Sequence, residues 1–97
     1  MELEGNVAMI TGGSAGLGAA MARRFAEEGA AVSICARSAS ALREVADEIR
    51  AAGGTCLAVA TDVTNPDAVE GWMERTHSEL GPVDTVVNNA SILGERV

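Results

Sequence analysis

The stretch Met9–Phe25, MITGGSAGLGAAMARRF, decides how this chain folds. Three residues separate Gly12 from Gly16, and one residue separates Gly16 from Gly18. An apolar run precedes this glycine-rich loop and a helical pattern follows it, so the loop is predicted to join a strand to a helix. The N–H groups and the positive end of the dipole at such a helix start form an anion site.

Each of these glycines has a distinct predicted task. Gly12 makes the tight turn, Gly16 lets the backbone approach a pyrophosphate, and Gly18 lets the helix pack close to the strand. The spacing differs from G-x-G-x-x-G, and no Gly-Lys-Ser/Thr follows as in a P-loop. A glycine-rich turn without a ligand remains the alternative that the loop alone leaves open.

Apolar runs and helical patterns alternate along the chain. Strands are predicted over residues 6–11, 30–36, 55–61 and 83–89, and helices over residues 16–28, 38–54 and 65–82. Ser38 or Ser40 is expected to cap the second helix, and Asn65 with Pro66 the third. This alternation, with short connections, predicts an α/β fold with a parallel sheet and helices on both faces.

Helical spacing also predicts which side chains face the core. The expected apolar faces are Leu17, Met21 and Phe25 on the first helix, and Val69, Trp72, Met73, Thr76 and Leu80 on the third. The lone histidine, His77, is expected to be solvated rather than catalytic. Gly29 is predicted to end the first helix.

Composition excludes several classes of function. The chain has 97 residues, enough for one domain, and its formal net charge of −7 argues against nucleic-acid binding. No apolar run reaches the ~20 residues of a membrane helix, and the acidic start, MELEG, does not resemble a signal peptide. Cys35 and Cys56 lack metal-ligand spacing, so we interpret them as buried thiols and expect a cytoplasmic protein without a metal.

Three motifs in order resemble those of the short-chain dehydrogenase/reductase family. Thr11–Gly18, TGGSAGLG, resembles its T-G-x-x-x-G-x-G motif, and Asp62-Val63 resembles its acidic adenine contact. Asn88–Ser91, NNAS, is similar to its N-N-A-G, with Ser91 in place of glycine. The resemblance covers essentially the whole chain. It implies a Rossmann-type doubly wound parallel sheet, incomplete, with about four strands in the order 3-2-1-4 and three helices.

The motifs and the strand ends together predict a cofactor site. Its residues are Thr11, Gly12, Ser14, Ala15, Gly16, Leu17, Gly18, Arg37, Ser38, Asp62, Val63, Asn89, Ala90 and Ser91. Asp62 is expected to accept from the adenine amino group, or else only to form a turn. Asn89 is expected to hold the ribose, tie neighbouring strands through its amide, or both, and Ser14 to lie near phosphate.

The residues at the end of the second predicted strand indicate whether the cofactor is NAD(H) or NADP(H). An NAD site typically has an acidic residue there, whereas this chain has Ala36 followed by Arg37 and Ser38. Arginine offers five donors and a permanent charge that suit a phosphate. We therefore predict NADP(H) rather than NAD(H).

The resemblance also implies a catalytic Tyr-x-x-x-Lys pair acting with a serine, which this sequence lacks. The chain has no tyrosine, and all 7 of its basic residues are arginine. We therefore expect residues 1–97 to be the N-terminal portion of one NAD(P)-binding Rossmann domain, inactive alone because the catalytic half is absent. The complete protein would act on a small carbonyl or alcohol substrate and pair with copies of itself.

Two alternatives remain at this stage. A short nucleotide-binding protein without catalysis would have the same motifs, and an S-adenosylmethionine-dependent methyltransferase is a distant third. The predicted fourth strand would form a sheet edge at Thr85–Val87, so the isolated chain is expected to be marginally stable or to self-associate.

Overall fold

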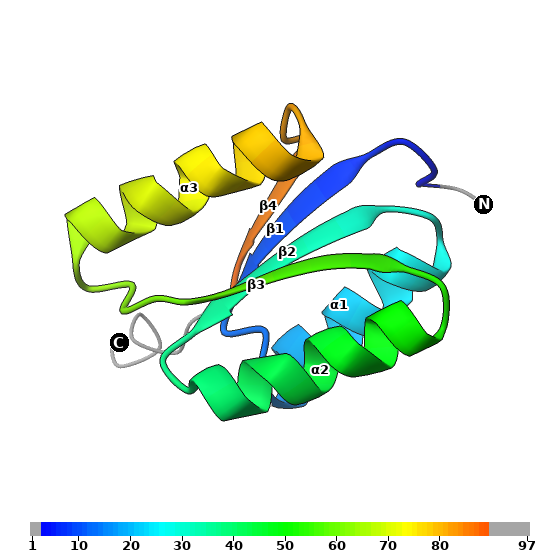
Figure 1. The fold of residues 1–97 in the computed structure, drawn as a ribbon, viewed down its shortest axis with the longest axis horizontal. Helices are drawn as coiled ribbons and strands as arrows, with labels where there is room; N and C mark the ends of the chain where they lie inside the picture. Colours follow the sequence, from blue (N-terminus) through cyan, green and yellow to red (C-terminus); the bar gives the residue numbers. More distant parts are fainter. Residues whose placement is uncertain (1–2, 90–97) are drawn as a thin grey trace.

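The computed structural model describes residues 3–89 and confirms the predicted alternation of strands and helices (Figure 1). The elements are β1 (Val7–Thr11), α1 (Gly16–Glu27), β2 (Ala31–Ala36), α2 (Ala39–Ala51), β3 (Thr55–Ala60), α3 (Pro66–Leu80) and β4 (Thr85–Asn88). Ser38 caps α2 and Asn65 caps α3, as the sequence predicted, and Gly29 follows α1 with φ +100°. The local signals at these helix ends therefore predicted the structure correctly.

The strands form one parallel sheet in the order β3-β2-β1-β4. Register pairs Val7 with Ala31 at one end of β1, and Thr11 with both Cys35 and Asn88 at the other. Helices α1 and α2 cover one face of the sheet and α3 covers the other (Figure 1). This is the doubly wound arrangement that the sequence predicted.

The core lies in two layers because successive strand residues point to opposite faces of a sheet. Ile10, Val32 and Ile34 pack toward α1 and α2, and Met9 and Cys35 pack with Trp72 of α3. The strands are therefore apolar on both faces, as expected for a sheet covered on both sides.

A buried polar cluster fixes α3 over β2. The Trp72 indole N–H donates to Ser33 Oγ at 2.7 Å, and the Ser33 and Thr76 hydroxyls are 2.7 Å apart. Thr76 Oγ1 in turn donates to the Trp72 carbonyl at 2.8 Å. Because an unpaired buried polar group is costly, these bonds favour one position of α3 on the sheet.

The predicted apolar faces of the helices are partly wrong. Leu17 is 67% exposed and Met73 is 51% exposed, although Met21 and Phe25 pack against the core as predicted. On α1 the buried positions are Gly18, Ala19 and Ala22, because the helix lies close to its neighbours and admits only small residues. Helix α3 contacts the sheet mainly through Trp72 and Thr76, which leaves Met73 to one side.

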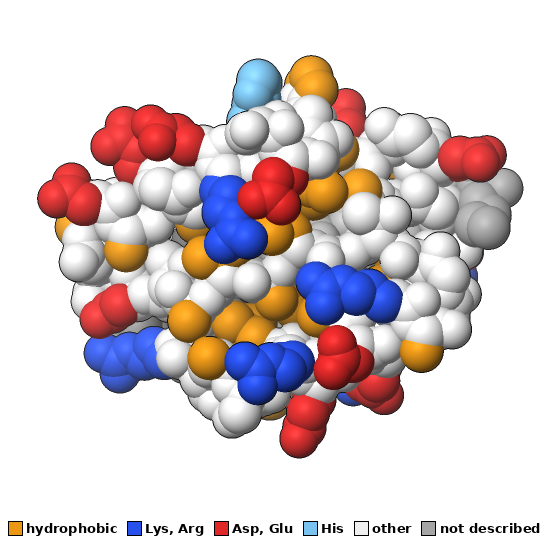
Figure 2. Space-filling model, in the orientation of Figure 1, with side chains coloured by type: hydrophobic (Ala, Val, Ile, Leu, Met, Phe, Trp, Pro, Cys, Tyr) orange, Lys and Arg blue, Asp and Glu red, His pale blue; other side chains and the backbone are white. Residues whose placement is uncertain are grey.

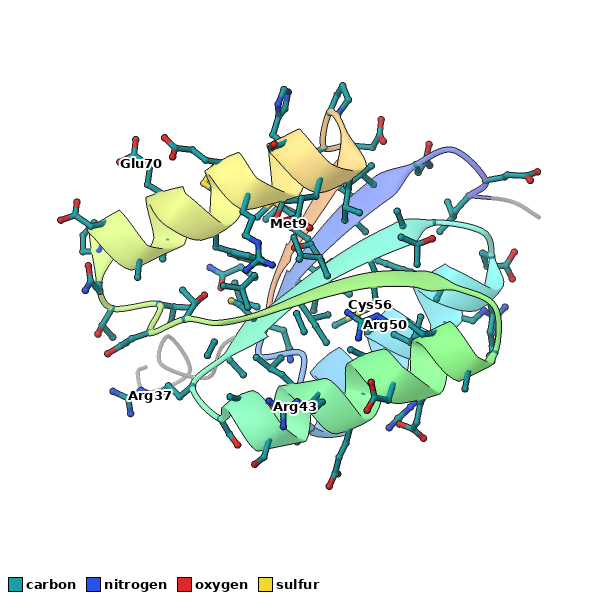
Figure 3. The ribbon with its side chains drawn as sticks, in the orientation of Figure 1. Met9, Arg37, Arg43, Arg50, Cys56 and Glu70 are labelled. Carbon is teal, nitrogen blue, oxygen red and sulfur yellow. The ribbon has the colours of Figure 1, made fainter. Side chains whose placement is uncertain are left out.

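The two edges of the sheet differ. At β3, Arg50 donates from Nη2 to the Cys56 carbonyl at 2.7 Å and so covers part of the edge (Figure 3). Figure 2 shows hydrophobic side chains between arginines over the face that includes β3 and α2. Within residues 3–89, strand β4 pairs only with β1, and its Val86 is 63% exposed. The predicted β4 edge is confirmed, and self-association through it stays a prediction.

An open apolar groove runs beside β4 on the α3 face. It has a volume of about 960 Å³, and the lining residues include Met9, Val69, Met73, Val83 and Val86. Within residues 3–89, no helix is both long and apolar enough to cross a membrane.

Candidate functional site

Most of the predicted site residues lie at the carboxyl ends of the strands and so at one end of the sheet. Thr11 ends β1, Arg37 follows β2, Asp62 lies two residues after β3, and Asn89 follows β4. Ligands of open α/β sheets bind beyond the carboxyl ends of the strands. The glycine-rich loop enters α1 at this same end of the sheet, so the fold assembles a candidate nucleotide site from segments distant in sequence (Figure 1).

The glycine-rich loop is anchored to β2. The N–H groups of Gly12 and Gly13 donate to the Cys35 carbonyl at 2.9 and 3.1 Å, so both are already used within the protein. Gly12 has φ +69° and Gly16 has φ +57°, a conformation that favours glycine. A Cβ built on Gly16 would meet no atom of the described residues within 4 Å, so this part of the chain leaves space for a ligand there.

Gly18 permits a close approach at the base of the site. A Cβ there would overlap the Gly12 carbonyl oxygen and lie 2.7 Å from Asn89 Nδ2. The predicted close packing is therefore present, but the neighbours are the loop and the end of β4 rather than the body of β1. Sequence reasoning missed Gly13, where a Cβ would lie 2.7 Å from Ile34 Cβ. The second glycine of the Gly-Gly pair was the available signal.

The three helix N-termini of the described chain are capped differently. Ser38 Oγ accepts from the Ala41 N–H at 3.3 Å, and Asn65 Oδ1 accepts from the N–H groups of Asp67 and Ala68 at 3.0 and 3.3 Å. The N-cap of α1 is Ala15, which makes no side-chain cap bond. An α-helix leaves its first N–H groups without intrahelical partners, so those of α1 suit an anion.

Thr11 joins the ends of β1 and β4. Its Oγ1 accepts from the Asn89 N–H at 2.8 Å and donates to Asn88 Oδ1 at 3.1 Å. The predicted tie between strands therefore exists, but it uses the backbone of Asn89 rather than its side-chain amide. Asn88, which the sequence analysis did not predict as a site residue, supplies the side-chain acceptor, and the paired asparagines were the signal that could have identified it.

Arg37 and Asp62 form an ion pair across the ends of β2 and β3, with 3.3 Å between Arg37 Nη2 and Asp62 Oδ2. Arg37 projects outward from the end of β2 (Figure 3). Asp62 also accepts from the Thr64 hydroxyl at 2.6 Å and the Thr64 N–H at 2.9 Å. These two bonds, and then the Arg37 guanidinium, lower the pKa of the Asp62 carboxyl, so Asp62 is a carboxylate at neutral pH.

The remaining predicted residues occupy different positions. Ser14, Ala15 and Leu17 are solvent-accessible on the open side of the loop, and Val63 packs beside the Met9 and Trp72 cluster. Ser38 follows Arg37, and its hydroxyl is used as a helix cap. Two further predicted cofactor contacts, Ala90 and Ser91, lie outside the described residues.

Both cysteines are buried and the histidine is exposed. Cys35 and Cys56 are buried, as predicted, and burial raises the pKa of each thiol to about 11. Both therefore stay protonated at neutral pH and are poor nucleophiles. His77 is exposed on α3, as expected.

Comparison with known proteins identifies relatives of this fold and site. The family model for short chain dehydrogenases matches residues 6–97. A short chain dehydrogenase of Pseudocercospora fijiensis is 42% identical over 94% of this chain and 29% of its own length. A 1-deoxy-11-beta-hydroxypentalenate dehydrogenase of Streptomyces arenae is 40% identical over 97% of this chain and 33% of its own length. The chain thus spans a minor part of the curated relatives that it matches.

Solved structures agree with the sequence relatives. A mutant short-chain dehydrogenase/reductase of Serratia marcescens is 40% identical, with a TM-score of 0.91 over 96% of this chain and 38% of that one. A metagenomic short-chain oxidoreductase in complex with NADP is 41% identical, with a TM-score of 0.87 over 93% of this chain and 41% of that one.

Proposed function

The chain belongs to the short-chain dehydrogenase family, and from this premise we propose that it is the NADP(H)-binding part of an oxidoreductase. In the complete protein, hydride would pass between a nicotinamide and a small carbonyl or alcohol substrate. The observation that carries the cofactor proposal is the combination of an uncapped α1 N-terminus with Arg37 at the end of β2.

The residues present fit a dinucleotide. The first-turn N–H groups of α1 would bind the pyrophosphate, and the open space at Gly16 leaves room for it. Ser14 would add a hydroxyl near a phosphate. Bound NADPH would supply the hydride, while the loop and α1 hold and orient the cofactor.

The adenosine end of the cofactor is proposed to lie between the ends of β2 and β3. Asp62 and Val63 would contact the adenine ring, and Asn89 would hold a ribose, with Ala90 and Ser91 as further proposed cofactor contacts. Arg37 and Ser38 would bind the 2′-phosphate, because Ala36 presents no carboxylate to repel it. The NADP complex among the structural relatives supports NADP(H) as the class of cofactor.

Catalysis by these 97 residues alone is not expected, because the sequence contains no tyrosine and no lysine. General acid–base groups typically contribute ~10²–10⁴-fold to rate, so their absence removes a large part of the activity. Cytoplasmic location and pairing of the complete protein with copies of itself stay predictions.

The proposal is tested by calorimetric titration of NADP⁺ and NAD⁺ against the purified protein and its Arg37→Ala variant. A hydrogen bond to a charged group is worth about 1.5–3 kcal/mol, so the variant should bind NADP⁺ roughly ten- to hundredfold more weakly. Binding of NAD⁺ should change little, because NAD⁺ lacks the 2′-phosphate.

Arg43→Ala is the matched control, because Arg43 is an exposed arginine of α2 and the charge change is the same. It should leave both affinities close to those of the unmodified protein. Equal binding of the two cofactors, or equal weakening of both by Arg37→Ala, would contradict the assignment of Arg37 to the 2′-phosphate.

A further inference from the structure

The two oxygens of the Asp62 carboxylate have separate partners. Oδ1 accepts both bonds from Thr64, at 2.6 Å from the hydroxyl and 2.9 Å from the N–H. Oδ2 faces Arg37 Nη2 at 3.3 Å. The Asn65 N–H also donates to the Asp62 carbonyl at 2.9 Å, which closes the turn before α3. Asp62 is therefore held by its own turn and presents one oxygen to Arg37.

Arg37 is the movable member of the pair. Its side chain is 79% exposed, against 43% for Asp62. Its bond to Asp62 is long, and exposed ion pairs are weak. A flexible, weakly held guanidinium can leave Asp62 for a stronger anion at little cost, whereas the Asp62 carboxylate stays where Thr64 fixes it.

We propose that Arg37 exchanges Asp62 Oδ2 for the 2′-phosphate when NADP(H) binds, which makes Asp62 a specificity-determining residue and Thr64 its positioning residue. The inference rests on the proposed function. Without the phosphate, as with NAD(H), Arg37 keeps its bond to Asp62. Asp62 therefore competes with the phosphate for Arg37, and its negative charge reduces the preference for NADP(H).

The test measures the ratio of NADP⁺ to NAD⁺ affinity by calorimetric titration in the purified protein. Any contact between Asp62 and adenine is common to both cofactors and cancels in this ratio. Asp62→Asn should raise the ratio about two- to fivefold, the range expected for loss of one exposed ion pair. Thr64→Val should raise the ratio of NADP⁺ to NAD⁺ affinity by less, because the Thr64 N–H remains. Thr64→Ser keeps the hydroxyl, so its ratio should equal that of the unmodified protein.

The Arg37→Ala background separates exchange from simple repulsion. If Arg37 is shared between Asp62 and the phosphate, adding Asp62→Asn to Arg37→Ala should change the ratio much less than Asp62→Asn does alone. The same gain in both backgrounds would mean that Asp62 acts on the phosphate directly, and the exchange would be wrong. Non-additivity is the sign of a coupled pair.

A spectroscopic readout follows Arg37 itself. Its side-chain Nε–H resonance should shift when NADP⁺ is added and stay in place with NAD⁺, and Asp62→Asn should shift it before any cofactor is present. If neither nucleotide binds, the proposed function is overturned. Arg37-dependent NADP⁺ binding with no effect of Asp62→Asn would overturn the exchange alone.

Discussion

Helices α1 and α3 begin in opposite ways. At α3, Asn65 accepts two backbone N–H groups, Pro66 occupies the first turn, and Asp67 adds a negative charge near the positive end of the dipole. At α1, Ala15 provides no cap, and the first turn contains no acidic residue. The N-terminus of α3 thus has a side-chain cap, whereas that of α1 has none, and the proposed function assigns the first N–H groups of α1 to a phosphate.

The presence or absence of a side-chain cap should affect stability and cofactor affinity differently at the two helix starts. A side-chain cap typically contributes about 0.5–2 kcal/mol to stability, and α1 forgoes it. Ala15 offers no side-chain acceptor to the first N–H groups of α1, and a Cβ built on Gly16 meets nothing within 4 Å among the described residues. Substitutions at α3 should therefore change stability alone, while substitutions at α1 should change both stability and NADP(H) affinity.

The largest effect is expected from Gly18→Ala. The new Cβ would overlap the Gly12 carbonyl oxygen and crowd Asn89 Nδ2, so α1 would have to move away from the loop. Overpacking costs about 1–3 kcal/mol, and overlap with backbone puts this case at the upper end. Urea unfolding should show this loss, and NADP⁺ titration should show greatly weakened binding.

Gly71→Ala in α3 is the matched control for this substitution. A Cβ at Gly71 would meet nothing within 4 Å, and alanine is the better helix former by about 0.5–1 kcal/mol. This variant should be slightly more stable and bind NADP⁺ normally. Equal destabilisation by the two substitutions would contradict the close packing assigned to Gly18.

A smaller effect is expected from Asn65→Ala, which removes the cap of α3. The free energy of unfolding should fall by about 1 kcal/mol, because two N–H groups lose their acceptor. NADP⁺ affinity should stay within about twofold, an energy difference well below that of the lost cap. A loss of affinity larger than the loss of stability would mean that α3 also belongs to the site.

The smallest effect on stability is expected from Ala15→Ser, which offers α1 a cap. Ala15 has the extended backbone of an N-cap residue, with φ −160° and ψ 163°. The serine should stabilise the fold by about 0.5–1 kcal/mol. It should also weaken NADP⁺ binding, because its hydroxyl would accept from the α1 N–H groups that are proposed to bind phosphate. Thermal unfolding and titration together check this, and tighter NADP⁺ binding would contradict it.

The sequence was sufficient for features that depend on local chemistry. The strand-turn-helix order followed from the glycine-rich loop, and the caps at Ser38 and Asn65 followed from residue type. The sheet order β3-β2-β1-β4 followed from the family resemblance. Each of these depends on neighbours in the chain or on a known motif.

Features that depend on tertiary distance were missed. Helical spacing placed Leu17 on an apolar face, but only glycine and alanine fit where α1 comes close to its neighbours. The pairing of Arg37 with Asp62 joins residues that only the register of β2 and β3 brings together. A sequence pattern indicates which residues share a face of a helix or strand, but it does not indicate how close the neighbouring element lies.

The most direct test of the central claim compares the two helix starts in one experiment. Backbone amide resonances of the purified protein are recorded while NADP⁺ is added. We expect large shifts for the amides of residues 14–18, at the start of α1, and small ones for Asp67 and Ala68, whose N–H groups Asn65 already binds. Comparable shifts at both helix starts, or none at α1, would contradict that claim.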